Sequence, residues 1–417
     1  MANAGSRQAR EPGKGVEVGT TNSVRSLNGL RESAGMMANP PQMLVPVING
    51  LGPAVSTGPD WLTGLMDAQD AGADSCGVRS ISRDMEDSEP GVGEEAPVAA
   101  ALPVQAIKAD IDALPRRQRL VEHGQFQVYC ARADQIGRVL QEIGRLREIT
   151  YRAAGEGTGR CTDIDVYDSY YLHLFVWDAR AQAIVGAYRL GLADRIVARY
   201  GMRALYTQSL FRYDQGALAC LDPAIELGRS FVRTEYQRDY APLLLLWRGI
   251  ARLIQDSPRY AVLFGPVSIS SHYEPGSLQL MVDYLTANNA DEALARQVHP
   301  RRPFRRQSPA GTIATALEAK SLDDLSRLVA EMEPDRKGVP ILLRQYLRLG
   351  GRLLGFSVDH RFRNTLDGLI VVDLRKTLPQ VLARYMGKSG SAAFYAYHDI
   401  DASSARRDVH NAVSAQA

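Results

Sequence analysis

The stretch PAIELGRSFV at residues 223–232 is followed by LLLLWRGIARLI at 243–254 and YAVLFGPV at 260–267. The first and third are short apolar runs typical of buried strands, whereas the second repeats its apolar residues at helical spacing. Next comes an amphipathic helical pattern around Leu278 to Leu285. Strand and helix therefore alternate twice, which predicts an α/β core.

The pattern extends in both directions from this core. Upstream, GQFQVYCARA at 124–133 alternates like a half-buried strand, and Asp134 is placed to cap a helix that continues to Leu146. YYLHLFVWD at 170–178 and AIVGAYRLG at 183–191 predict an antiparallel hairpin across the short segment ARAQ.

Downstream, residues 322–332 and 341–349 have helical patterns, and GRLLGFSV at 351–358 and LDGLIVVDL at 366–374 have strand patterns. The whole order predicts an α/β (α+β) fold, a mixed sheet flanked by helices with extra helices toward the C-terminus.

Aromatic residues are very unevenly distributed. Residues 1–100 contain no Phe or Tyr and a single Trp, Trp61. Such a segment cannot bury enough apolar surface to offset its chain entropy. We therefore expect a disordered tail at 1–103, one folded domain at 104–400 and a second disordered tail at 401–417.

Charge and cysteine content narrow the class of protein. The formal net charge is +2, so no global field favours a nucleic-acid partner. The four cysteines form no CxxC pair, and no apolar segment follows the N-terminal arginines as in a signal peptide. The longest uncharged apolar run, Leu243 to Trp247, is too short to span a bilayer. We expect a cytoplasmic protein, with peripheral contact at the inner face of the membrane as the alternative.

Several blocks, in order, resemble one known family. They are IGRLREITYRAAGEGTG (143–159), DIDVYDSYYLHLFVWD (163–178), IVGAYRLG (184–191), IELGRSFV (225–232), LFGPVSIS (263–270), VPILLRQYLRLGGRLLGFSVD (339–359) and LDGLIVVDL (366–374). Together they are similar to the hemolysin-like GNAT N-acyltransferases. That family includes the ornithine-lipid N-acyltransferases and has a distant similarity to acyl-homoserine-lactone synthases.

The resemblance implies direct acyl transfer, in which an acceptor amine attacks a thioester carbonyl and the carrier thiol leaves. It implies a long-chain acyl group on acyl carrier protein, L-ornithine as acceptor, and lyso-ornithine lipid as product. Two alternatives remain open: a synthase resembling those for acyl-homoserine lactones, which would use S-adenosylmethionine, and a non-catalytic module on a carrier or membrane surface.

The resemblance places the catalytic group on the strand IELGRSFV, at Glu226, Arg229 and Ser230. Glu226 is the expected base, because an acceptor amine arrives mainly as ammonium and a carboxylate must accept its proton. The alternative is an edge carboxylate paired with Arg229. In a regular strand these two side chains need not point the same way, but a bulge at Gly228 would change that.

The resemblance also implies an acceptor site of arginines and acidic residues, in which Arg147 binds a carboxylate and Asp165 or Asp168 binds an amine. The predicted members of this site are Arg147, Glu148, Asp163, Asp165, Asp168 and Arg189. The alternative is a solvated loop that Arg147 holds in place. No metal is expected, because three Asp without a further ligand pattern are a weak calcium signal.

The donor loop differs from the common acetyl-CoA pattern, in which glycines let backbone N–H groups hold a pyrophosphate. Here the corresponding stretch is QRDYAP at 237–242, and Pro242 removes one N–H. This favours acyl carrier protein as donor, bound through its phosphopantetheine thioester, with acyl-CoA as the alternative and no permanently bound cofactor. The predicted donor-binding residues are Val232, Arg233, Gln237, Arg238, Tyr240, Ser268 and Ser270.

Two basic clusters suit an acidic carrier protein or an anionic membrane surface. One is HPRRPFRR at 299–306, and the other is formed by Arg344, Arg348 and Arg352. For the second, a charged face on a surface helix is the alternative.

Overall fold

The computed structural model describes residues 62, 65, 95–220, 223–306 and 319–400. The predicted tails at 1–103 and 401–417 lie outside this range, apart from Leu62, Leu65 and residues 95–103. Helix α2, the first element after residue 95, begins at Val104.

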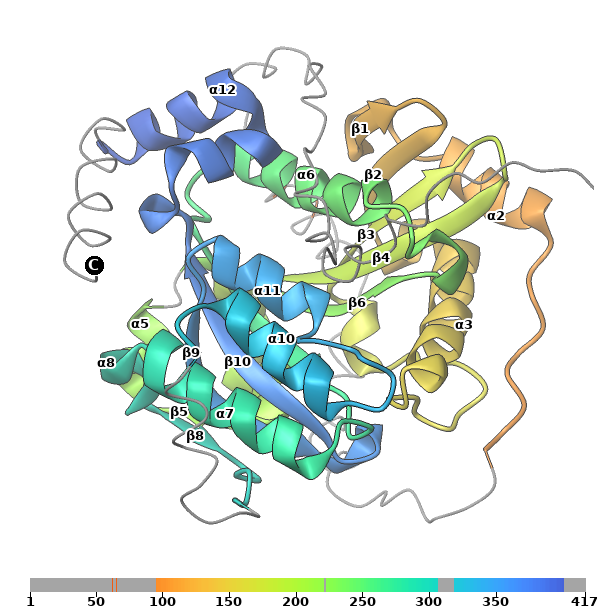
Figure 1. Cartoon of the computed structure of the whole chain (residues 1–417). Coiled ribbons are helices and arrows are strands. Elements are labelled where there is room, and N and C mark those ends of the chain that lie inside the picture. Colours follow the sequence, from red (N-terminus) through yellow and green to blue (C-terminus); the bar gives the residue numbers. More distant parts are fainter. Residues whose placement is uncertain (1–61, 63–64, 66–94, 221–222, 307–318, 401–417) are drawn as a thin grey trace, which may run out of the picture. The chain divides into compact units, whose positions relative to one another are not determined.

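Eight strands form one sheet in the order β1-β2-β3-β4-β6-β7-β10-β9 (Figure 1). They are β1 Arg119–His123, β2 Phe126–Arg132, β3 Leu172–Asp178, β4 Ala183–Leu192, β6 Ala224–Val232, β7 Val262–Ile269, β9 Arg352–Asp359 and β10 Thr365–Asp373. β6 and β7 run parallel, and every other neighbouring pair is antiparallel. A separate two-stranded sheet pairs β5 (Phe211–Tyr213) with β8 (Val298–Pro300).

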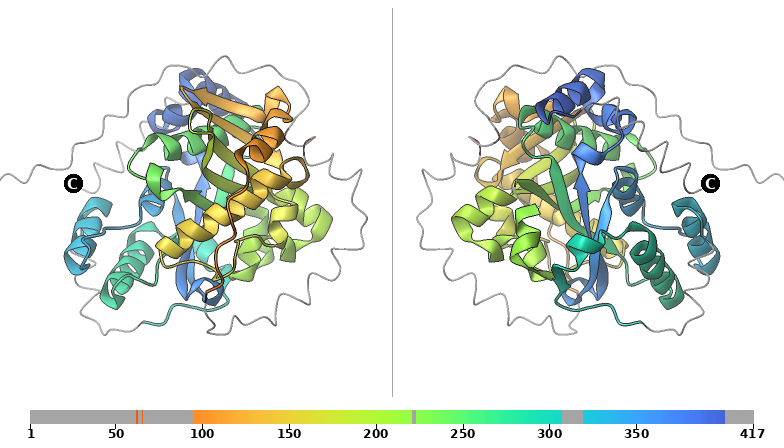
Figure 2. Two further views of the ribbon diagram at one scale, coloured as in Figure 1. Left: turned by 90° about the vertical axis from the view of Figure 1, so that its right-hand side faces the viewer. Right: turned by 90° about the vertical axis from the view of Figure 1, so that its left-hand side faces the viewer.

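Helices lie on both faces of the large sheet, and further helices pack against these or against the small sheet. The described helices are α2 Val104–Asp112, α3 Gly137–Ala153, α4 Ala193–Tyr200, α5 Gln215–Cys220, α6 Ala241–Asp256, α7 Pro275–Asn289, α8 Glu292–Ala295, α10 Leu322–Met332, α11 Ile341–Arg348 and α12 Pro379–Tyr397. Figure 2 shows α7 and α10 on one side of the sheet and α4 on the other. This architecture confirms the predicted mixed sheet flanked by helices, including the additional helices near the C-terminus.

Strand alternation explains how α3 and α6 come to lie on opposite faces. Phe175 of β3 belongs to the apolar cluster that α3 covers. Its neighbour Leu174 faces α6, where a Cβ on Gly249 would lie 2.9 Å from the leucine side chain. Successive strand residues point to opposite faces, so β3 is buried on both sides.

The start of α3 differs from the prediction. Asp134 does not cap this helix: a 3-10 turn at Ala133–Gln135 comes first, and α3 begins at Gly137 after Ile136. Both Asp134 carboxylate oxygens instead accept hydrogen bonds from Arg132, each at 2.9 Å. The Asp134 side chain therefore pairs with Arg132 instead of capping α3.

The two parallel strands separate after a short contact. β6 and β7 pair only from Ala224–Glu226 to Val262–Phe264, although β6 continues to Val232 and β7 to Ile269. At Gly265 the backbones are very close, since a Cβ there would lie 2.0 Å from the carbonyl oxygen of Leu227. Pro266 follows and has no N–H to extend the ladder. The sheet therefore opens between these strands.

Candidate active site

A bulge in β6 sets the directions of the side chains beside the opening. Ala187 of β4 pairs with Phe231 and Arg189 pairs with Gly228, so Arg229 and Ser230 together oppose a single β4 residue. Arg229 has a φ of 47°, in the left-handed region that costs a non-glycine residue about 1–2 kcal/mol. Both Arg229 and Ser230 consequently line the space between β6 and β7.

That space is a cavity of about 130 Å³. Its lining residues come from several separate parts of the fold: Tyr151, Glu156, Tyr206, Arg229, Ser230, Pro266, Ser268, Leu342, Phe362 and Asp367. The walls combine a cation, two carboxyl groups and hydroxyl groups with apolar side chains. Such a cavity, mostly enclosed and with a few polar groups directed inward, is typical of a small-molecule site.

Glu226, the base expected from the sequence, is not among these lining residues. Its side chain is 1% exposed, and its carboxylate accepts hydrogen bonds from the Tyr171 hydroxyl and from the backbone N–H groups of Tyr206 (3.2 Å) and Thr207 (2.6 Å). Burial raises the pKa of Glu226, while these donors oppose the shift. The carboxylate thus holds the turn that carries Tyr206 to the cavity wall.

Five of the six predicted acceptor residues meet in one buried network, which Arg229 of the predicted catalytic group joins and which does not include Glu148. Arg147 donates to Asp168 at 2.9 Å, and Arg189 pairs with Asp165 at 2.5 Å and with Asp168 at 3.4 Å. Arg229 pairs with Asp163 at 3.2 Å and Asp165 at 3.1 Å. Of the six residues in this network, Arg229 is the one that lines the cavity, so none of the predicted acceptor residues does.

Charges in this network compensate one another. Burial alone would raise the pKa of Asp168, but Arg147 and Arg189 outweigh it and lower that pKa. Arg189 lies within 5.3 Å of the ring centroids of Tyr167 and Tyr171, so its guanidinium also faces aromatic surface. Three arginines and three aspartates in mutual contact leave the cluster without net charge.

Glu148 has a local role in the loop after α3. Its buried carboxylate accepts from the Thr158 backbone (3.1 Å) and hydroxyl (2.6 Å), from the Gly159 backbone (2.9 Å) and from Arg152 (2.7 Å). These bonds fix the glycine-rich loop that contains Glu156, and the Glu156 backbone N–H donates to the Tyr151 carbonyl at 2.7 Å.

Comparisons with known proteins identify the family of this chain. Residues 146–247 match the model of the acetyltransferase (GNAT) domain. A glycine N(alpha)-acyltransferase of Phocaeicola vulgatus is 27% identical over 303 residues, which are 69% of this chain and 92% of the relative. An L-ornithine N(alpha)-acyltransferase of Rhizobium meliloti is 30% identical over 264 residues, covering 60% of this chain and 77% of the relative. This chain belongs to the GNAT family of N-acyltransferases. No solved structure matches it at a significant level.

In this N-acyltransferase, two carboxyl groups face the cavity. Burial raises the pKa of Glu156 to about 7. Burial first, and then the charge of Asp359, raises the pKa of Asp367 well above its ordinary value. Asp367 also accepts a hydrogen bond from Ser268 at 2.9 Å. Burial therefore shifts both carboxyl groups toward their protonated forms.

Most of the predicted donor residues follow β6 and lead into α6. Gln237 donates to the Val232 carbonyl at 2.8 Å, Arg233 pairs with Glu235 at 2.8 Å, and Arg238 is exposed. Tyr240 immediately precedes α6, whose first turn contains Pro242. The Asp239 carboxylate accepts from the Ala241 N–H at 2.9 Å, so this helix start already carries a negative charge.

The two serines predicted to bind the donor lie in different places. Ser268 lines the cavity beside Asp367. Ser270 lies beyond the end of β7 and donates to the Ala154 carbonyl at 2.7 Å, which connects this segment to the end of α3.

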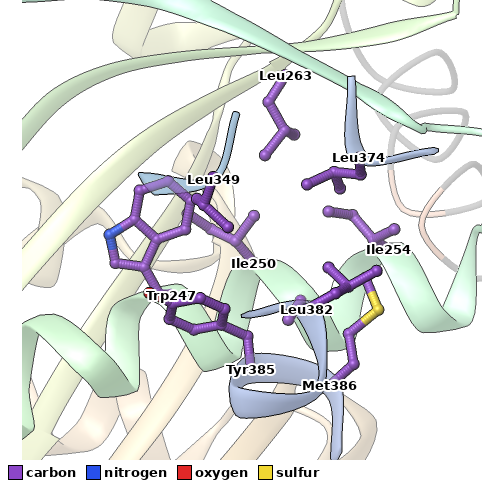
Figure 3. A pocket seen from close by; sticks show the side chains of 10 residues that line it. Trp247, Ile250, Ile254, Leu263, Leu349, Leu374, Leu382, Tyr385 and Met386 are labelled. Carbon is purple, nitrogen blue, oxygen red and sulfur yellow. The ribbon is translucent and has the colours of Figure 1, made fainter. Parts of the chain in front are cut away.

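An apolar pocket lies between α6, β7 and α12. Figure 3 shows Leu263, Leu382 and Met386 converging on it, with Trp247 and Tyr385 at one side. Its volume is about 10 Å³, at the lower limit for one water. A fatty acyl tail does not fit there unless these side chains move.

Among the described residues, no helix has the length and apolar composition needed to span a membrane.

Sequence reasoning missed Glu156, Asp367, Tyr151, Tyr206 and Phe362 as lining residues. One signal was present: Asp367 interrupts the apolar strand LDGLIVVDL, just as Glu226 interrupts its own strand. A carboxyl group in an apolar strand needs a partner or a function. Asp367 therefore shares the sequence feature that singled out Glu226.

Proposed function

We propose that this N-acyltransferase transfers a long-chain fatty acyl group from acyl carrier protein to the α-amine of an amino acid, with L-ornithine as the acceptor and lyso-ornithine lipid as the product. The observation that carries the proposal is the cavity between the separated strands β6 and β7, with a cation and two carboxyl groups in its wall. In GNAT enzymes the strand corresponding to β6 lines the thioester site, so donor and acceptor would meet at this opening.

The lining suits an acceptor that carries positive charge. Arg229 is already paired with Asp163 and Asp165, so its charge is largely compensated. Glu156 and Asp367 then supply acidic groups for an ammonium, and a diamino acid such as ornithine brings two. Relatives named as L-ornithine N(alpha)-acyltransferases support this choice.

Glycine is the second candidate acceptor. The glycine N(alpha)-acyltransferase relatives align over 92% and 84% of their own lengths. A cavity of about 130 Å³ also accommodates so small an amino acid.

The start of α6 supports the choice of donor. A CoA pyrophosphate at this helix end would meet the Asp239 carboxylate and the missing N–H of Pro242. Phosphopantetheine on a carrier protein has a single phosphate and avoids most of this penalty. The arginines of the segment 299–306 would then contact the acidic carrier, although Arg306 also pairs with Asp283 at 2.7 Å.

The chemistry requires the acceptor ammonium to lose a proton first. The amine nitrogen then forms a bond to the thioester carbonyl carbon, and the C–S bond breaks as the sulfur leaves with its electron pair. Of the three protons on the ammonium, one remains on the amide, one goes to the thiolate and one is released to solvent.

The test uses purified protein with palmitoyl-carrier protein or palmitoyl-CoA and, separately, ornithine, glycine or S-adenosylmethionine. Mass spectrometry should detect N-palmitoyl-ornithine, with a higher kcat/KM for the carrier donor than for CoA. Product from S-adenosylmethionine alone would instead indicate a homoserine-lactone-type synthase. Binding of the carrier without any acylated amine would indicate a non-catalytic module.

A further inference from the structure

The position of Glu156 in the cavity points to a role for this residue. Glu156 lies in the turn after α3, where Gly155 has a φ of +77° and a Cβ would overlap the ring of His272. Only glycine fits at that position, because it lacks the Cβ. The Glu148 bonds to Thr158 and Gly159 hold the other side of the loop. The backbone of Glu156 is therefore fixed with its side chain in the cavity wall.

Among the described residues, the Glu156 carboxylate has no hydrogen-bond or ion-pair partner, unlike Glu226, Asp165 and Asp168. A half-buried carboxylate without a partner is costly, since burial penalises its charge. An acceptor ammonium would supply the missing partner.

Asp367 of β10, which lines the same cavity, has a different role. It is 4% exposed, already accepts from Ser268, and lies near Asp359. Burial and the neighbouring Asp359 carboxylate favour its protonated form, which donates a hydrogen bond and does not accept a proton.

We propose that Glu156, which lines the same cavity wall as Asp367, is the residue that accepts the proton from the acceptor ammonium. This inference rests on the proposed N-acylation of an amino acid. Glu156 takes one proton from the ammonium, which frees the nitrogen lone pair to form the C–N bond. The proton then passes to solvent before the next turnover, while the departing sulfur takes the second proton from the same nitrogen.

Several titratable or charged groups surround Glu156, but burial is what shifts its pKa. They are Tyr151 of α3, Tyr206 before β5, Arg229 of β6, His272 and Tyr273 after β7, and Asp367 of β10. Burial raises the pKa of each of the three tyrosines, so these remain neutral at pH 7. Arg229 is paired elsewhere, and burial is what raises the pKa of Glu156 to about 7. Because the carboxylate form is the base, activity should rise with pH through about 7.

The test removes the charge of Glu156 and keeps the shape of its side chain. Glu156→Gln should lower kcat/KM for the acceptor by about 100-fold or more at pH 7, and the loss should shrink as pH rises and free amine accumulates. Glu156→Asp, which keeps the carboxylate on a shorter side chain, should recover part of the activity. Asp367→Asn should lose about tenfold or less, because an uncharged group replaces an uncharged group.

Glu274→Gln is the matched control, since Glu274 is exposed at the start of α7 and lies outside the cavity lining. It should retain wild-type activity. Circular dichroism and a melting temperature establish that each variant is folded. If wild type makes no N-acyl amino acid, the proposed function fails. If wild type does so and folded Glu156→Gln matches it at every pH, the role of Glu156 is overturned while the proposed function stands.

Discussion

Two regions of this N-acyltransferase hold carboxyl groups in contrasting ways. Around Glu226 and the Arg147–Asp168 pair, every carboxylate has arginine, tyrosine or backbone donors within its own network. The Glu156 carboxylate, by contrast, faces the cavity and has no partner in the part of the chain that the structure describes. A satisfied carboxylate stabilises the fold, whereas an unsatisfied one in a cavity is available to a substrate. Substitutions in the first region should therefore mainly change stability, and those in the second should mainly change rate.

The largest stability effect is expected at Arg147, which is 1% exposed and paired with Asp168. Arg147→Ala would leave buried aspartates without compensation and should lower the free energy of unfolding by about 3–5 kcal/mol. Urea denaturation measures this. Arg348→Ala, at an exposed position on α11, is the control and should change it by about 0.5 kcal/mol or less. A stable Arg147→Ala protein with a strongly raised KM for the acceptor would place Arg147 in the acceptor site instead.

A smaller stability loss is expected at Glu226. Glu226→Gln replaces one acceptor oxygen by an NH2 group facing Tyr171, Tyr206 and Thr207, and should cost about 1–3 kcal/mol. Thermal unfolding measures the change. Glu226→Asp, with a carboxylate that no longer reaches Thr207, is a useful comparison, because it separates loss of charge from loss of position. A stability equal to wild type would show that these bonds do not hold the Tyr206 turn.

At Glu156, removing the carboxylate should raise the stability of the protein instead of lowering it. Its pKa is about 7 in the folded protein and 4.5 for the ordinary side chain, so folding favours the protonated form. Below pH 4.5 the group is protonated in both the folded and the unfolded protein, so it costs no stability. As pH rises from there through 7, the unfolded protein ionises first and the free energy of unfolding falls. Glu156→Gln should therefore be more stable than wild type by about 1–3 kcal/mol at pH 8, with no difference near pH 4. Melting curves at both pH values measure this, and a destabilised variant at pH 8 would mean that Glu156 has a partner in the folded protein.

The smallest effect is expected at the start of α6. Asp239→Asn can keep the cap on the Ala241 N–H but removes the negative charge. It should lower KM for acyl-CoA by about 2- to 5-fold and leave KM for the carrier donor nearly unchanged. Steady-state kinetics with both donors measures the difference. Equal improvement for both donors would argue against a phosphate group near this helix end.

The sequence predicted the fold well where apolar patterns were strong. The strand, helix and strand around residues 223–267 appear as β6, α6 and β7, and the hairpin of β3 and β4 has the predicted connection. Helix α12 was missed, because its glycines and small residues weaken the helical pattern, and Gly387 breaks it with a φ of 75°.

The site was harder to predict than the fold. The sequence singled out Arg147, Asp165 and Arg229 as charged residues in an ordered motif, and the structure brings them together. It could not show which of them face a cavity, because that depends on the bulge at Arg229 and on the separation of β6 from β7. Glu156 lies 70 residues before Glu226 in a glycine-rich loop, and only tertiary packing places it beside β10.

The most direct test compares the two glutamates as bases. The measurement is kcat/KM for ornithine against pH, from about 5.5 to 9, for wild type, Glu156→Gln and Glu226→Gln with the same acyl-carrier donor. We expect wild type and folded Glu226→Gln to share a rise through about pH 7, and Glu156→Gln to lose that rise and most of its activity at neutral pH. The opposite result, in which Glu226→Gln loses the rise and Glu156→Gln keeps it, would contradict the assignment and make Glu226 the base.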